Sequence, residues 1–76
     1  MRTEDIETRI KNAFPDCDVV VMDTTGGGDH FDVRVVSKTF EGKTRIQQHQ
    51  AVMAVFAPEL KTGELHALAL KTFTKI

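Results

Sequence analysis

The sequence predicts a two-layer α+β domain in the order helix, strand, strand, broken helix and strand. Three observations predict it. Apolar residues recur at helical spacing in two segments, β-branched or alternating apolar residues mark three others, and a glycine triplet separates the first two strands. A chain of 76 residues allows a single domain, covering residues 1–76, with a modest core.

Residues 3–14, TEDIETRIKNAF, are expected to form the first helix. Thr3 is expected to cap it, acidic residues fill its first turn, and Pro15 ends it. One face of this helix carries its apolar side chains, which are Ile6, Ile10, Ala13 and Phe14.

Two strands are expected to follow as an antiparallel hairpin. Residues 17–24, CDVVVMDT, are apolar and β-branched, with Cys17 expected in or near the core. The run from His30 to Ser37 alternates apolar and polar residues, as a half-buried strand does. Between them, glycines 26–28 predict a mobile turn that delivers His30.

The C-terminal half predicts a connector, a broken helix and a third strand. Residues 37–43 are polar with a turn at Gly42, and a helical period then runs to residue 60 before Gly63 ends it. Pro58 is expected to split this helix into a long and a short piece. Residues 65–73, LHALALKTF, predict the third strand. The apolar stripe expected on the broken helix comprises Ile46, His49, Val52, Met53, Phe56 and Leu60.

The topology brings two histidines together. Residues 38–64 lie between the second and third strands and are long enough for a parallel crossover, which places both helices on one face of a three-stranded mixed sheet. Parallel strands begin at the same edge about 4.8 Å apart, so His30 and His66, at the two strand starts, are expected to reach a common atom. The alternatives are a turn-closing role for His30 and an exposed strand-end role for His66.

Residues 30–72 resemble the BolA family. The likeness rests on VVS at residues 35–37, followed by FEGK at 40–43 and by Arg45. It continues with Q-x-H at residues 47–49, an E-L pair at 59–60 and H-A-L at 66–68. It implies a fold similar to the type II KH fold. Where the family often has arginine and asparagine after the helix histidine, this sequence has Gln50 and Met53.

The resemblance also implies a function. BolA-like proteins are expected to act as adaptors that bind a monothiol glutaredoxin and share or receive a 2Fe–2S cluster, held jointly with glutathione, in cluster assembly and trafficking or in iron and redox regulation. His66 of the H-A-L motif is the expected cluster ligand and His30 the second one. Lys71 and Lys75, expected after the third strand, are candidates for docking the partner.

The alternative function is a KH-like, nucleic-acid-binding transcriptional regulator of the stress response or cell morphology. Lys38, Lys43, Arg45 and Lys61 are the candidates for a small basic edge that contacts DNA. Against it, the chain lacks the G-x-x-G loop of KH domains and has a net charge of −1.

Composition and motifs exclude several other classes of protein and site. The single cysteine excludes an intramolecular disulfide and a thiolate zinc site, and it fits the cytoplasm, or an organelle matrix if the source is eukaryotic. No apolar run reaches the ~18 residues of a membrane span. His49 is expected to be packed and hydrogen-bonded. No catalytic constellation or phosphate loop is found, so we expect a non-enzymatic protein. The family resemblance implies that it is monomeric alone and forms a heterodimer with glutaredoxin.

Overall fold

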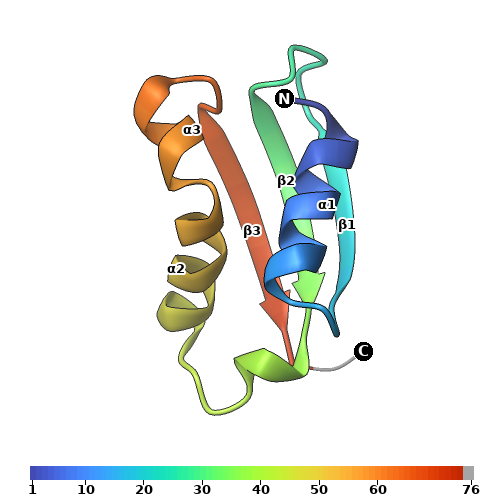
Figure 1. The fold of residues 1–76 in the computed structure, drawn as a ribbon, viewed down its shortest axis with the longest axis vertical. Coiled ribbons are helices and arrows are strands. Elements are labelled where there is room, and N and C mark those ends of the chain that lie inside the picture. The colour runs from blue at the N-terminus through green and yellow to red at the C-terminus, as the bar shows by residue number, and fades with distance from the viewer. Residues whose placement is uncertain (75–76) are drawn as a thin grey trace.

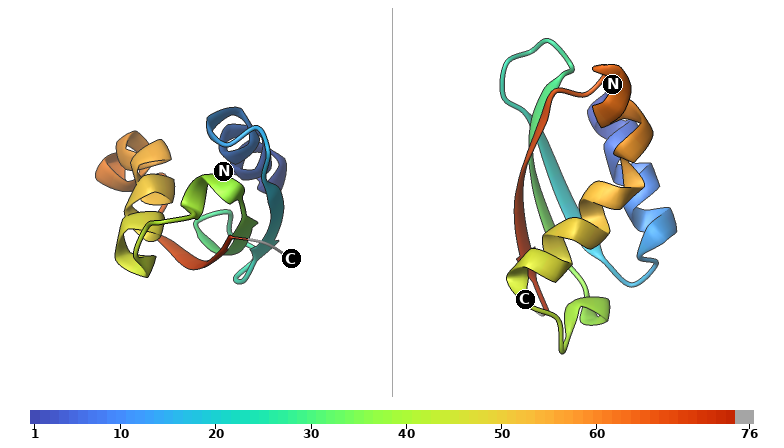
Figure 2. Two further views of the ribbon diagram at one scale, coloured as in Figure 1. Left: turned by 90° about the horizontal axis from the view of Figure 1, so that it is seen from below. Right: turned by 90° about the vertical axis from the view of Figure 1, so that its left-hand side faces the viewer.

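The computed structural model describes residues 1–74 and has two layers, a three-stranded sheet and the helices that cover one of its faces (Figures 1 and 2). This confirms the predicted α+β class. The elements are α1 (Thr3–Ala13), β1 (Asp18–Asp23), β2 (His30–Val36), the 3-10 turn η1 (Lys38–Phe40), α2 (Arg45–Val55), α3 (Ala57–Thr62) and β3 (Ala67–Phe73).

The sheet has the order β1-β2-β3 and is mixed. β1 pairs antiparallel with β2, and β2 pairs parallel with β3 in a register that sets His30 opposite Ala67 and Val36 opposite Phe73. The strict alternation in β2 buries Phe31, Val33 and Val35 beneath the helices, as predicted. The third strand begins two residues later than predicted, at Ala67, so Leu65 and His66 lie in the segment before β3.

The helix α1 covers one part of the sheet through Ile6 and Ile10, which are fully buried. Two predictions about this helix are wrong. Thr3 is its first residue rather than its cap, because the carboxylate of Asp5 accepts the N–H of Arg2 at 3.1 Å and so caps the helix from within its first turn. Ala13 is exposed, because the chain leaves the helix there.

The buried face of α2 keeps Val52 and Phe56 of the expected stripe but not Ile46, and it adds Gln48. Thr44 caps the helix and shares a capping box with Gln47, which fixes where the helix begins. From that start Gln48, Val52 and Phe56, spaced four apart, face the core. Ile46 was expected inside but is 70% exposed, because it lies on the other side of the helix.

The positions of proline and glycine explain the break in the helix and the turn in the connector. The break falls at Phe56, one residue before α3, and Pro58 lies in the first turn of α3, where a missing N–H costs no helical hydrogen bond. The polar connector contains η1, and its Phe40 is fully buried, 5.3 Å from the Phe14 ring. Gly42 has a φ of 79°, the left-handed conformation expected at this turn.

Candidate metal-ligating site

Two connections meet at one end of the sheet. The loop from β1 to β2 and the segment from α3 to β3 lie side by side at the end where β2 and β3 begin (Figure 1). Parallel pairing of β2 and β3 requires this arrangement. His30 is the first residue of β2, and His66 immediately precedes β3.

The glycine loop is held in place by the side chain of Asp23, at the end of β1. Its carboxylate accepts N–H groups from Thr25 at 3.2 Å, Gly26 at 2.8 Å and Gly28 at 3.0 Å. Gly26 and Gly28 have φ values of 77° and 72°, which L side chains rarely adopt. One carboxylate therefore satisfies three backbone donors of the loop, which gives the glycine segment a defined backbone conformation.

The backbone of Asp29 fixes His66 relative to His30. The carbonyl oxygen of Asp29 accepts the N–H of His66 at 2.8 Å and the N–H of Ala67 at 3.2 Å. Leu65, which is fully buried, anchors the same segment in the core. Each histidine is thus attached to backbone that hydrogen bonds hold in place.

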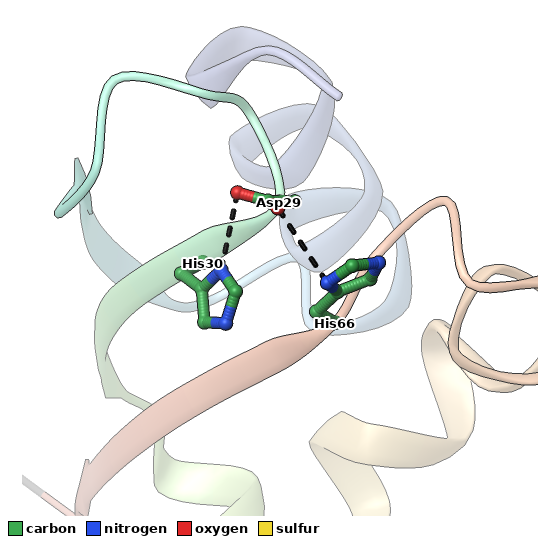
Figure 3. A group of neighbouring side chains, drawn as sticks. All are labelled: Asp29, His30 and His66. Carbon is green, nitrogen blue, oxygen red and sulfur yellow. Dashed lines mark ion pairs between the residues drawn. The ribbon is translucent and has the colours of Figure 1, made fainter.

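The side chains of Asp29, His30 and His66 form a cluster, shown in Figure 3. The ring centroids of the two histidines are 5.5 Å apart and the ring planes are tilted by 79°. The Nδ1 atoms of His30 and His66 lie 3.1 Å and 3.5 Å from the two oxygens of Asp29. The second nitrogen of each ring points away from that carboxylate (Figure 3). The sequence argument for neighbouring imidazoles thus agrees with the coordinates.

Electrostatics favour an ionised Asp29 between the rings. The contact with the His30 ring has the largest effect and holds the pKa of Asp29 below its ordinary value. Burial, second in size, acts against it, whereas the Thr25 hydroxyl and the charges of His30 and His66 when protonated add to the lowering. The 3.1 Å contact lies off the line of the ring N–H, so Nδ1 of His30 has no well-aligned hydrogen bond.

The three side chains can act as metal ligands. One ligand atom from each lies within 4.8 Å of the others, and all three side chains are at least one-third exposed. Imidazole and carboxylate are the ligands of zinc and of non-haem iron. The sequence analysis missed Asp29, although its position beside His30 in the loop was a usable signal.

The predicted basic residues do not form one edge. Lys43 and Arg45 adjoin the start of α2, whereas Lys61 belongs to α3 at the opposite end of the molecule (Figure 1). Lys71 lies within β3 rather than after it, because the pairing with β2 continues to Phe73. Lys75 lies outside the described residues.

Cys17 and His49 have no part in the histidine cluster. Cys17 is 6% exposed and burial raises the pKa of its thiol, as expected of a core residue. His49 was expected to be packed and hydrogen-bonded. It is half-buried on α2, but within residues 1–74 its Nε2 atom is buried and has no hydrogen-bond partner.

Comparisons with known proteins identify the family. Residues 8–76 match the family model described as BolA-like protein. The chain is 38% identical to the protein BOLA2 of Arabidopsis thaliana, covering 90% of this chain and 72% of that one. It is 35% identical to the DNA-binding transcriptional regulator BolA of Escherichia coli, covering 97% and 76%. The solved BolA domain of SufE1 from Arabidopsis thaliana superimposes with a TM-score of 0.85 at 28% identity, over 95% of this chain and 90% of that domain. The chain therefore belongs to the BolA family.

Proposed function

We propose that this protein is an adaptor that binds a monothiol glutaredoxin and shares or receives a 2Fe–2S cluster through His66 and His30. The observation that carries the proposal is the pair of exposed imidazoles, with centroids 5.5 Å apart, at the shared start of β2 and β3. His66 is the principal ligand because it is the more exposed ring, at 56% against 42%.

Ligand counting supports a shared cluster. A 2Fe–2S cluster takes four ligands besides its bridging sulfides, and histidine can replace cysteine on one iron. This chain has one cysteine, which is buried in the core. It can therefore offer imidazoles at its surface but no thiolate, and the thiolates must come from the glutaredoxin and its glutathione.

The carboxylate of Asp29, which lies behind the two imidazoles, also suits the site to a metal that a partner brings. Asp29 lies against Nδ1 of both rings, which leaves the outward nitrogen of each ring available. A carboxylate beside the second nitrogen of a ligating histidine orients the ring and raises its basicity. In this proposal Asp29 positions the two ligands.

The test mixes the protein with a cluster-loaded monothiol glutaredoxin and records visible absorption and circular dichroism. His66→Ala should abolish the spectrum of the mixed complex and leave that of the glutaredoxin alone, and His30→Ala should alter it in part. His49→Gln, a histidine outside the cluster, is the matched control and should behave as the wild type. Identical spectra for the wild type and His66→Ala would refute the assignment.

A second candidate is DNA binding. The Escherichia coli relative named a DNA-binding transcriptional regulator favours it. So does the presence of two basic residues, Lys43 and Arg45, at the start of α2. Salt-dependent binding to a DNA duplex that is lost in Lys43→Gln and Arg45→Gln would support this function. Binding that both variants retain would count against it.

A further inference from the structure

The helices leave one face of the sheet uncovered (Figure 2). The even-numbered residues of β2 point to this face, because Phe31, Val33 and Val35 are buried beneath the helices. The same alternation brings exposed residues of β1 and β3 to it. We call this surface the open face and define it by six exposed residues in its middle, which are Val20, Met22, Asp32, Arg34, Ala69 and Lys71.

The strand register divides these six residues into two rows that run across the sheet, two residues apart along each strand. The acidic row is Met22, Asp32 and Ala69, and the basic row is Val20, Arg34 and Lys71. Each row begins with an apolar side chain on β1, and these two side chains are 63% and 57% exposed. The open face therefore presents two neighbouring rows of opposite charge beside uncovered apolar surface.

The charges of the open face have no partners within the molecule. Within residues 1–74, none of Asp32, Arg34 and Lys71 forms an ion pair. Arg34 and Lys71 lie directly opposite each other on neighbouring strands, where like charges repel. The guanidinium of Arg34 lies over the ring of Phe73, 4.8 Å from its centroid, and makes no contact with a carboxylate. A carboxylate above the basic row would relieve this repulsion.

A second copy of the chain fits this pattern when a twofold axis relates the two copies. The axis lies between the two rows, parallel to the sheet and across the strands, so the acidic row of each copy faces the basic row of the other. Asp32 then lies over Arg34 of the second copy, with Lys71 of that copy beside it. Met22 lies over Val20 of the second copy. An axis along the strands, or one above either row, would set like charges face to face, so the charges select a single arrangement.

The shape and size of the open face suit a weak contact. Its six residues surround a hollow of about 320 Å³ that side chains of a second copy can enter. The net charge of −1 gives little general repulsion between copies. Three strands about 4.8 Å apart and about seven residues long, at about 3.3 Å each, cover roughly 14 by 23 Å. This is small beside the ~800 Å² that each partner buries in a stable complex.

We propose that two copies of the chain associate through their open faces as a weak homodimer in which Asp32 of each copy pairs with Arg34 of the other. A small interface of this kind predicts a dissociation constant of about 0.1–1 mM, so the protein is monomeric in dilute solution and dimeric when concentrated. The two rows favour a second copy because they complement each other in both sign and order. The proposal is independent of the shared cluster, because none of the six residues is a proposed ligand.

The experiment is sedimentation equilibrium at about 0.02–2 mM, a range that brackets the expected dissociation constant. Asp32→Lys and Arg34→Glu should each weaken self-association about tenfold or more, because each variant sets like charges against one another across the axis. An equal mixture of the two variants should associate as the wild type does. In that mixed dimer, positions 32 and 34 carry opposite charges in both pairs.

The matched controls reverse charges away from the open face. Glu41→Lys, in the connector, and Lys61→Glu, in α3, change the net charge as the two test variants do, and both positions are exposed. Each control should associate as the wild type does, and their mixture should gain nothing. Asp32 and Arg34 are also exposed, and far-UV circular dichroism checks that the variants fold.

Three outcomes overturn the proposal. The first is a wild-type protein that stays monomeric up to about 2 mM, beyond the range expected for this interface. The second is a mixture of Asp32→Lys and Arg34→Glu that associates no better than its components, or controls that weaken association equally, since either result would leave only general charge effects. The third is loss of glutaredoxin binding in both open-face variants without self-association of the wild type, which would assign the face to that partner.

Discussion

Replacing Gln48 by methionine removes the polar centre of the helix-covered core. Gln48 is 8% exposed, and its amide nitrogen donates to the carbonyls of Phe40 at 3.2 Å and Lys43 at 3.0 Å. Its amide oxygen accepts the hydroxyl of Thr72, itself 7% exposed, at 2.6 Å. One side chain thus joins the connector, α2 and β3.

The expected loss follows from these contacts. Each buried hydrogen bond contributes about 1 kcal/mol net, and a buried hydroxyl or carbonyl left without a partner costs about 1–3 kcal/mol. Methionine fills a similar volume, so we expect Gln48→Met to lower the free energy of unfolding by about 2–4 kcal/mol. That is a large share of the roughly 4–11 kcal/mol typical of a domain of this size.

Urea unfolding followed by circular dichroism measures the effect, and a double-mutant cycle isolates the pair. Thr72→Val alone should cost about 1–2 kcal/mol, and its coupling with Gln48→Met should be about 1 kcal/mol. Gln50→Met, an exposed glutamine on the same helix, should change the stability by less than about 0.5 kcal/mol. A Gln48→Met variant as stable as Gln50→Met, or a cycle with no coupling, would refute the network.

Three further predictions concern other anchored groups. The buried thiol of Cys17, whose pKa burial raises, should react with a disulfide reagent only as the domain unfolds, and rapid labelling of the native protein would contradict this. The hydrogen bond from the Ser37 hydroxyl lowers the pKa of Asp16 below 3.8, so this carboxylate stabilises the fold above that pH and loses the effect as pH falls through the lowered value. The destabilisation by Asp16→Asn in urea should therefore be present at about pH 7 and shrink as the pH falls below the ordinary aspartate value, and a pH-independent difference would exclude the charge as its cause. Asp23→Ala should speed amide hydrogen exchange at Gly26 and Gly28 by about tenfold or more while β2 stays protected, and unchanged exchange would show that the loop is held by other contacts.

The strands and their order could be predicted because their signals are local or topological. The alternation of Phe31, Val33 and Val35 fixes which face of β2 is buried, independently of what packs there. The crossover is long enough for β3 to lie parallel to β2, and a parallel β3 beside β2 brings His30 close to His66, as the structure has them.

The burial of α2 could be predicted only in part, because Val52 and Phe56 of the expected stripe are buried but Ile46 is exposed. Apolar spacing favoured a stripe that included Ile46, yet the polar Gln48 occupies the buried face. Glutamine is acceptable there only because Phe40, Lys43 and Thr72 supply partners from three separate segments. No pattern within the helix encodes those contacts.

The spacing of the two imidazoles depends on backbone contacts more than on the rings themselves. Asp23 holds the glycine loop, and the carbonyl of Asp29 bonds the segment that carries His66, so the distance between the strand starts is set before any partner arrives. A partner that contributes thiolates then meets imidazoles whose positions are already restricted, which reduces the entropy lost on association. Gly26 and Gly28 adopt the positive φ values that let the chain fold around Asp23, so the loop presents His30 from a hydrogen-bonded turn.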